Sequence, residues 1–314
     1  MKLIVMIPCY NEEKTLPLVI NSIPKKIKGI DSVETLIIDD GSKDKTVEVA
    51  KKLNVNYIVR HKGNKGLAKA FATGIETALE KGADIIVNTD GDNQYPQEDI
   101  PRLIEPILKG EAEIVVADRQ TDKIAHFSPI KKFFQKFGSW IVKTVSHADI
   151  PDAVSGFRAY SRDAAMQLNI MTNFSYVTET IIQASKKRIP ITSIKINTNP
   201  KTRESRLFKN IWQHMKKTGS SIIRIYAVYE PLKFFLYIGG VLGILGTIGV
   251  LRFLYYFILG NGTGHVQSLV LSSVLIIIGF QIAIFGIIAD LIGINRKLLE
   301  DALLNQKKEK FNKK

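Results

Sequence analysis

The sequence predicts an α/β fold in which helices cover both faces of a mostly parallel sheet, followed by a pair of apolar helices. Short apolar runs alternate with segments of helical periodicity through residues 1–118, as in parallel sheets with helical crossovers. The stretches 234–251 and 269–289 contain no charged side chain, and about 20 apolar residues are enough to cross a bilayer.

This alternation defines the elements in order. The expected strands are the apolar runs 3–7, 35–38, 55–59, 84–87 and 113–117. The expected helices have apolar residues about every 3.6 positions and occupy 11–23, 44–53, 65–82 and 96–110. Residues 119–200 are less regular, with a helix expected at 176–188 and a strand at 191–198.

The net charge of +14 is concentrated beside the apolar stretches. Residues 201–233 carry an excess of six positive charges, and residues 296–314 an excess of four. Basic residues flanking an apolar segment favour an anionic membrane surface, whereas a nucleic-acid binder more often spreads them over a folded face. We therefore expect a lipid bilayer as partner and no nucleic acid.

Two transmembrane helices are expected within residues 232–292, at about 233–258 and 268–291. The loop between them has no Lys or Arg, whereas Lys233 and the tail 293–314 are basic. The positive-inside rule then places residues 1–206 and both termini in the cytoplasm. The amphipathic segment 207–231 would lie at the interface. Copies of the chain could associate through the apolar helices, and a buried hairpin of a soluble protein is the alternative.

A zinc site is not expected, because the chain has one cysteine and five scattered histidines. The stretch "NTDGDNQY" instead places Asp90 and Asp92 at the exit of an apolar strand. Such a pair suits Mg²⁺ or Mn²⁺, which prefer oxygen ligands, and Gln94 could add a carbonyl oxygen. A solvated turn with a helix-capping Asp is the alternative reading.

Polar clusters also follow the other strands: "PCYNEE", "DDGSKD" and "DR". Ligands of open α/β sheets bind at the carboxyl ends of the strands. Asp40 could accept hydrogen bonds from a nucleobase or ribose. No GxGxxG follows the first strand and no GxxxxGK[ST] is present, which argues against a dinucleotide fold and a P-loop.

Seven motifs together resemble family 2 of the glycosyltransferases, which has the GT-A fold. They are "IPCYNEE", "IIDDGSKDKT", "NKGLAKAFATGI", "NTDGDNQYP", "ADR", "DAVSGFRAYSR" and "RESRLFK". The order and spacing are similar to the dolichyl-phosphate mannose synthase and polyprenyl-phosphate glucosyltransferase group. The resemblance covers about residues 1–210, and the apolar helices suit the membrane-anchored members.

The resemblance implies roles at matching positions. The residues implied in nucleoside binding are Pro8, Tyr10, Glu12, Asp39 and Asp40. Asp90, Asp92 and Gln94 would hold a metal that bridges the diphosphate of the donor. Arg119 would reach this diphosphate, and Arg203 and Lys209 would close over the donor.

The expected reaction is the transfer of a hexose from a GDP- or UDP-linked sugar to polyprenyl phosphate, with inversion. A metal ion and cationic side chains would stabilise the diphosphate that leaves. A lipid phosphate is largely ionised near pH 7 and needs no general base. A hydroxyl acceptor would need one, and Asp152 or Glu179 are the candidates. Glu179 could instead pair with Lys186 or Arg188 on its helix.

Two other functions remain open from the sequence. One is a glycosyltransferase that acts on a hydroxyl acceptor, as in polysaccharide or glycolipid synthesis. The QxxRW motif of processive synthases is absent, and two spans are few for a polymer channel. The other is a membrane adaptor without catalysis, against which the intact Asp90, Asp92 and Arg119 argue.

Overall fold

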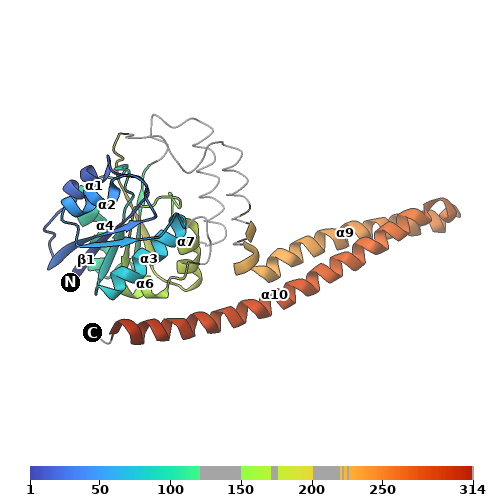
Figure 1. Cartoon of the computed structure of the whole chain (residues 1–314). Helices are drawn as coiled ribbons and strands as arrows, with labels where there is room; N and C mark the ends of the chain where they lie inside the picture. Colours follow the sequence, from blue (N-terminus) through green and yellow to red (C-terminus); the bar gives the residue numbers. More distant parts are fainter. Residues whose placement is uncertain (121–149, 171–175, 201–219, 221–222, 225, 313–314) are drawn as a thin grey trace. The chain divides into compact units, whose positions relative to one another are not determined.

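The computed structural model describes residues 1–120, 150–170, 176–200, 220, 223–224 and 226–312 (Figure 1). The chain divides into two compact units. The first comprises Met1–Thr218 and Leu304–Lys314, and the second comprises Gly219–Leu303. Most of the segment 207–231, together with Arg203 and Lys209, lies outside the described residues.

A seven-stranded sheet in the order β3-β2-β1-β4-β6-β5-β7 organises the first unit. The strands are β1 (Lys2–Cys9), β2 (Ser32–Asp39), β3 (Tyr57–Arg60), β4 (Ile85–Asn88), β5 (Ile114–Asp118), β6 (Arg158–Ser161) and β7 (Ile191–Lys195). Strand β6 is antiparallel to β4 and β5, and the other pairs are parallel. The mostly parallel sheet and the strands expected from the apolar runs are confirmed. Strand β6 was not expected, because its sequence "RAYS" contains no apolar run.

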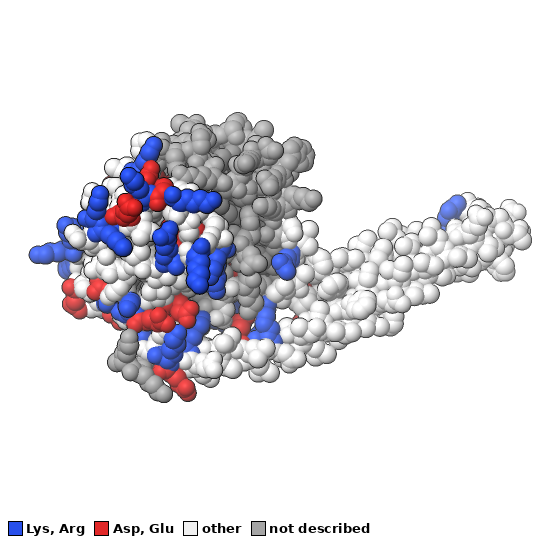
Figure 2. Space-filling model, in the orientation of Figure 1, with Lys and Arg blue, Asp and Glu red and all other residues white. Residues whose placement is uncertain are grey.

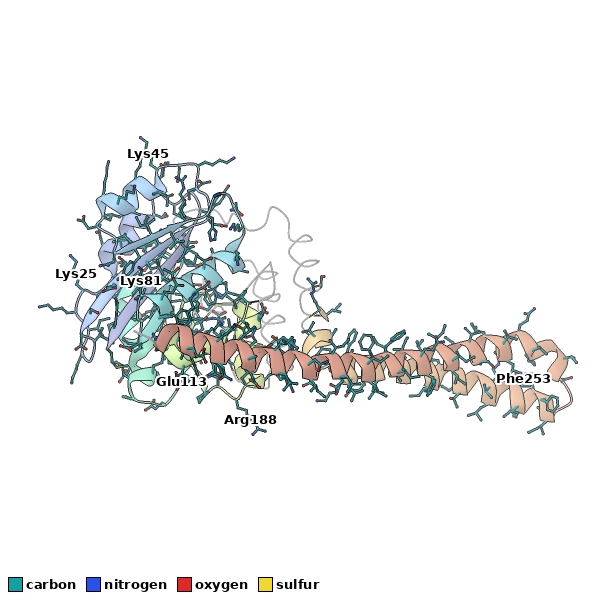
Figure 3. All side chains as sticks on the ribbon, turned by 60° about the horizontal axis from the view of Figure 1, so that its bottom comes forward. Lys25, Lys45, Lys81, Glu113, Arg188 and Phe253 are labelled. Carbon is teal, nitrogen blue, oxygen red and sulfur yellow. The ribbon has the colours of Figure 1, made fainter. Side chains whose placement is uncertain are left out.

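Helices cover both faces of this sheet, as the sequence predicts. They are α1 (Leu16–Ser22), α2 (Thr46–Lys52), α3 (Leu67–Glu80), η1 (Gln97–Asp99), α4 (Ile100–Leu108), α6 (Arg162–Gln167) and α7 (Tyr176–Lys186). Leu3, Val5 and Ile7 of β1 belong to one core cluster with residues of α1 and α4. On the opposite face, Met6 of β1 lies against Gly74 of α3. Because β1 is covered on both sides, its sequence is a continuous apolar run. The charged side chains of Lys25 and Lys45, by contrast, point outward from the unit (Figure 3).

The second unit is built from the two long apolar helices, α9 (Pro231–Ile258) and α10 (Val266–Asn312), with η3 (Gly262–His265) between them. Both are long and apolar enough to cross a membrane. Only 11% of the most apolar window of each is buried, unlike a core helix of a soluble protein. Figure 2 shows how little charge their surface carries. The expected pair of apolar helices is therefore confirmed.

The end of α10 packs on the first unit instead of forming a separate tail. The Lys307 ammonium donates to the carbonyl oxygens of Met166 and Leu168, at 3.1 and 3.0 Å, and to Asn169 Oδ1 at 2.9 Å. Phe311 is buried, and its carbonyl accepts a hydrogen bond from Arg162 at 2.8 Å. These contacts explain why the helix continues past residue 292, where the sequence suggested that a basic tail begins.

Close backbone approach holds α9 against α10. A Cβ atom at Gly239 would lie 2.5 Å from the carbonyl oxygen of Gly279, whereas one at Gly240 would meet nothing within 4 Å. Small residues let apolar helices pack closely where no water drives them together. The glycine at position 239 is therefore required by packing, and the adjacent one is not.

We predict that Gly239→Ala destabilises the hairpin by about 1–3 kcal/mol, because the added methyl group forces the backbones apart. Gly240→Ala is the matched control, with the same change of helix propensity and no close neighbour. Thermal unfolding in detergent compares the two variants. Equal shifts in the unfolding midpoint would contradict the packing described.

Candidate active site

The polar clusters follow strands β1, β2, β4 and β5, which run in one direction, so their carboxyl ends share one edge of the sheet. Strand β6 runs the opposite way. The segment 152–157 that precedes it therefore reaches the same edge, where Gly156 lies beside Asp90. This edge holds most of the described residues that the sequence predicts for the site.

Asp39 and Asp40 at the end of β2 are both buried. Asp39 Oδ1 accepts a hydrogen bond from the backbone of Ser42 at 3.1 Å. Its Oδ2 lies 3.1 Å from Arg60 Nε, but no donor is aligned with it for a hydrogen bond. Asp40 accepts from the backbone N–H groups of Lys65 and Gly66, at 2.9 and 2.8 Å. Asp40 thus closes the turn before α3, while Asp39 pairs with the Arg60 side chain.

His61 completes this corner and was not predicted from the sequence. Its Nδ1 lies 2.7 Å from Asp40 Oδ1, and its Nε2 lies 3.1 Å from Thr73 Oγ1. The ring is thereby fixed between strand β3 and helix α3. A single histidine with no sequence pattern around it gave no signal for this contact.

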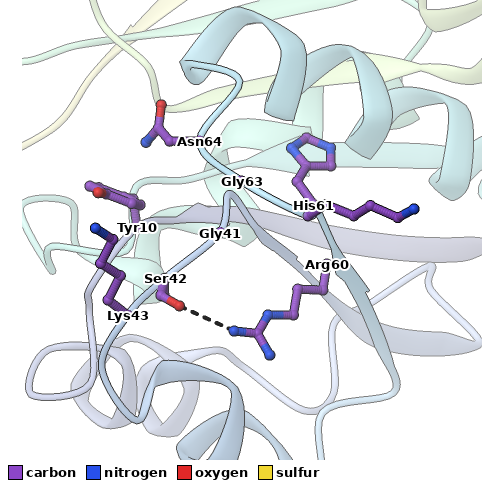
Figure 4. A pocket seen from close by; sticks show the side chains of 9 residues that line it. Tyr10, Gly41, Ser42, Lys43, Arg60, His61, Gly63 and Asn64 are labelled. Atoms are coloured by element: carbon purple, nitrogen blue, oxygen red, sulfur yellow. Dashed lines mark hydrogen bonds between the residues drawn. The ribbon is translucent and has the colours of Figure 1, made fainter.

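An open pocket of about 720 Å³ lies beside this corner (Figure 4). It is lined by Tyr10, Gly41, Ser42, Lys43, Arg60, His61, Lys62, Gly63 and Asn64. The Arg60 guanidinium donates to the Ser42 carbonyl at 3.2 Å. An aromatic ring, three basic side chains and several backbone groups suit a planar, negatively charged ligand.

The turn that follows β4 carries Asp90 and Asp92, both half-buried. Asp92 Oδ1 accepts from the backbone N–H of Gln94 at 3.1 Å, and Asn93 has the positive φ of 58° that completes the tight turn. A Cβ atom at Gly91 would lie 3.2 Å from both Cys9 Sγ and Glu12 Cγ. The aspartate turn therefore rests directly on the segment that follows β1.

Arg119 and Asp152 form a buried ion pair beside this turn. Arg119 Nε and Nη2 donate to the two Asp152 oxygens at 2.6 and 2.9 Å. Burial alone would lower the pKa of Arg119, but Tyr95, Asp152 and Asp90 outweigh it, so the pKa is raised. Arg119 is therefore a permanent cation near the aspartate turn.

The donor set at the turn fits a divalent cation that takes further ligands from its substrate. Among the described residues, no group of three or more His, Cys, Asp or Glu side chains could hold a metal ion. Asp90 and Asp92 offer hard carboxylate oxygens on one half-buried turn. Mg²⁺ is commonly held by one or two carboxylates together with water and substrate phosphates.

The other predicted residues have different surroundings. Pro8 lies in β1, and its carbonyl faces the aspartate turn. Glu12 is buried and accepts from Thr15 Oγ1 at 2.8 Å. Glu179 is buried in α7 and lies 3.4 Å from the Gln183 amide. The role of the Gln94 side chain as a metal ligand stays a prediction.

Two further residues were missed by sequence reasoning. The hydroxyl of Tyr176 accepts from Asn88 Nδ2 at 2.8 Å and lies next to Asp90 around Gly156. The guanidinium of Arg158 is fully buried below the same segment. The motif "DAVSGFRAYSR" contained Arg158, but a spacing pattern could not reveal that the side chain points into the core.

The sheet, the pocket and the aspartate turn together define an α/β protein with a ligand site at the carboxyl ends of its strands. The chain belongs to the family "Glycosyl transferase family 2", whose model matches residues 4–168. It is therefore a glycosyltransferase. The seven motifs had indicated this family, and the comparison confirms it.

Two relatives are similar over the first unit. A UDP-N-acetylglucosamine–dolichyl-phosphate N-acetylglucosaminyltransferase of Methanococcus voltae is 33% identical over 62% of this chain and 84% of its own length. A dolichol-phosphate mannosyltransferase of Pyrococcus furiosus is 31% identical over 60% of this chain and 54% of its own. The polyprenyl-phosphate sugar transferases expected from the motifs are thus among the homologues.

The fold is shared with a solved structure. Glucosyl-3-phosphoglycerate synthase from Mycobacterium tuberculosis, in complex with Mn²⁺, UDP and glucosyl-3-phosphoglycerate, has a TM-score of 0.55 at 19% identity. The match covers 72% of this chain and 78% of the other. The GT-A fold predicted from the sequence is thereby confirmed.

We predict that Asp152→Ala lowers the free energy of unfolding by about 3–5 kcal/mol, because it leaves the Arg119 charge buried without its carboxylate. Thermal or denaturant unfolding measures the loss. The control is the same substitution in an Arg119→Met background, where no buried charge remains and the cost should be much smaller. An equal cost in both backgrounds would show that the pair is not what Asp152 contributes.

Proposed function

We propose that the protein transfers a hexose from a nucleoside diphosphate sugar to a polyprenyl phosphate at a membrane surface, with the help of Mg²⁺ or Mn²⁺. The observation that carries this proposal is the aspartate turn at Asp90 and Asp92, which adjoins the residues after β1 in a family 2 enzyme. The two apolar helices of the same chain suit a lipid-linked acceptor.

The pocket around Tyr10 is the proposed site for the nucleoside. The Tyr10 ring could stack on the base, and Asp39, whose buried Oδ2 lies 3.1 Å from Arg60 Nε, would hold this arginine at the wall of the pocket. Lys43 and Lys62 in the pocket would attract the diphosphate. Pro8, Glu12 and Asp40 would then support the site, since Glu12 and Asp40 are buried and engaged by neighbours. The relatives' names include a UDP-linked donor, which makes UDP sugars the first to test.

Asp90 and Asp92, with Gln94, would hold the cation, which supplies positive charge for the diphosphate that leaves. Arg119 would add a second, fixed positive charge, because its pKa is raised and Asp152 holds its side chain in place. Arg203 and Lys209 are proposed to close over the donor. A charge positioned before the reaction stabilises the leaving group without reorganisation.

The surroundings of the two candidate bases favour a phosphate acceptor over a hydroxyl. Both oxygens of Asp152 are engaged by Arg119, and Glu179 is buried in α7. A hydroxyl would need a base within hydrogen-bond reach. A lipid phosphate, with a second pKa of about 6, is already ionised near pH 7. Its oxygen would form the bond to the anomeric carbon with inversion, as the bond to the diphosphate breaks and the electron pair leaves with that group.

The end of helix α10 supports the proposed topology. Lys307 and Phe311 belong to the same compact unit as the sheet, so the chain leaves this unit before α9 and returns to it within the last turns of α10. Two membrane crossings would place the catalytic unit and both termini on one side. The basic residues flanking the helices favour the cytoplasmic side. The segment 207–231 is proposed to lie at this interface.

We predict that Asp92→Asn lowers transfer by about 100-fold or more, because it removes a charged ligand next to the leaving diphosphate. Release of labelled sugar from the donor measures this. Asp99→Asn is the matched control, since Asp99 pairs with the exposed Arg102 near the start of helix α4. Excess EDTA should abolish wild-type transfer, and added Mn²⁺ should restore it. Full transfer in EDTA would rule out the metal.

The acceptor class is tested with a matched pair of lipids, a polyprenyl phosphate and the polyprenol of the same chain length. We predict transfer to the phosphate only, because of the two candidate bases Asp152 is engaged by Arg119 and Glu179 is buried in α7. Full-length protein in lipid nanodiscs is given labelled UDP- and GDP-hexoses, and the lipid product is separated. Transfer to the polyprenol at a similar rate would favour the hydroxyl-acceptor alternative.

A further inference from the structure

Arg158, at the start of strand β6, is a fully buried guanidinium that is satisfied by neutral oxygens. Its Nε donates to the Ser155 carbonyl at 2.8 Å, and its Nη2 to the Ala153 carbonyl at 2.9 Å. Its Nη1 donates to the Val177 carbonyl and to Thr180 Oγ1, both at 2.7 Å. No ion pair between Arg158 and a carboxylate occurs among the described residues. Burying a charge without a carboxylate partner costs free energy of folding, so we expect Arg158 to matter for the geometry that its hydrogen bonds impose.

The segment held by Arg158 contacts both charged parts of the candidate site. Asp152, at its start, accepts two hydrogen bonds from the Arg119 guanidinium. Gly156, near its end, lies under Asp90: a Cβ atom there would be 3.1 and 3.2 Å from the two carboxylate oxygens. The backbone N–H of Gly156 donates to the Tyr95 hydroxyl at 2.9 Å. A displacement of this segment would therefore move a cation and a predicted metal ligand together.

The other two bonds of Arg158 reach the first turn of α7, which carries Tyr176. The Tyr176 ring stacks on Phe71, with centroids 3.8 Å apart and planes 4° from parallel. A Cβ atom at position 156 would lie 3.1 Å from its hydroxyl. Gly156 of the segment thus lies against both the Asp90 carboxylate and the Tyr176 hydroxyl of helix α7.

We propose that Arg158 is a positioning residue that fastens the segment 152–156 to helix α7 and thereby sets Asp90 and Arg119 for the donor diphosphate. The inference rests on the proposed function for the identity of that ligand. Arg158 touches no reacting atom. Its planar fork directs four bonds from three nitrogens at once, which a lysine ammonium cannot reproduce.

The test measures Mn²⁺ binding to the full-length protein in detergent with UDP present, by electron paramagnetic resonance, and again with GDP. Arg158→Lys keeps the charge and most of the volume but loses the fork. We expect the dissociation constant for Mn²⁺ to rise about tenfold, as when groups that support a metal ligand are lost. Binding of UDP in EDTA should change little, since residues elsewhere line the pocket.

Arg162→Lys is the matched control, because Arg162 also donates to backbone carbonyls, those of Ala83 and Phe311, at 2.9 and 2.8 Å. It should lower stability without changing Mn²⁺ affinity. Gly156→Ala is a second variant that disturbs Asp90 directly and leaves Arg158 in place. It should weaken Mn²⁺ binding in the same direction.

Two results would overturn different claims. If Arg158→Lys and Gly156→Ala bind Mn²⁺ with UDP as tightly as wild type, the positioning inference fails while the proposed function stands. If the wild-type protein itself binds no Mn²⁺ with either nucleotide, the metal-dependent function fails, and the inference fails with it. A loss of Mn²⁺ affinity in Arg162→Lys equal to that in Arg158→Lys would reduce the role of Arg158 to general stability.

Discussion

A buried carboxylate must be matched by hydrogen-bond donors or a cation, and this requirement shapes the carboxyl edge of the sheet. Asp40, Asp118 and Asp152 are all buried there. Asp40 is held by backbone N–H groups and His61, Asp118 by the backbone of Gln120 at 2.9 Å, and Asp152 by Arg119. These contacts close the turns that follow the strands. Asp90 and Asp92 are only half-buried on the turn after β4, at the same edge.

The reversed direction of strand β6 brings an additional chain segment to the carboxyl edge of the sheet, which a purely parallel sheet would lack. In a parallel sheet, only segments that follow a strand reach the carboxyl edge. Because β6 is antiparallel to both neighbours, the segment before it arrives there too. That segment brings Asp152 to Arg119 and Gly156 to Asp90. One inserted strand thus joins the cationic and acidic parts of the site.

The sequence predicted the parts of the fold whose signals are local. Strand β1 and helix α3 show the periodicities of a doubly covered strand and an amphipathic helix, and the aspartate turn follows β4 at a recognisable spacing. His61 and Arg158 were missed for the opposite reason. His61 contacts Asp40 and Thr73, 21 and 12 residues away, and two of the bonds of Arg158 reach Val177 and Thr180, 19 and 22 residues away. A pattern read along one chain segment does not contain such contacts.

The end of helix α10 was also unpredictable, because its composition suggests a solvated tail. Lysines near a terminus normally remain in water, yet Lys307 caps the carbonyl oxygens at the end of α6, where a helix leaves such groups unsatisfied. The helix has 47 residues, which at about 1.5 Å per residue is roughly 70 Å, far more than a bilayer core of about 30 Å requires. Its polar half is therefore longer than a span requires, and Lys307 with Phe311 gives the end of that half a defined place on the catalytic unit. The chain leaves the catalytic unit before α9 and rejoins it within the last turns of α10, so this unit is connected in sequence to both outer ends of the apolar hairpin.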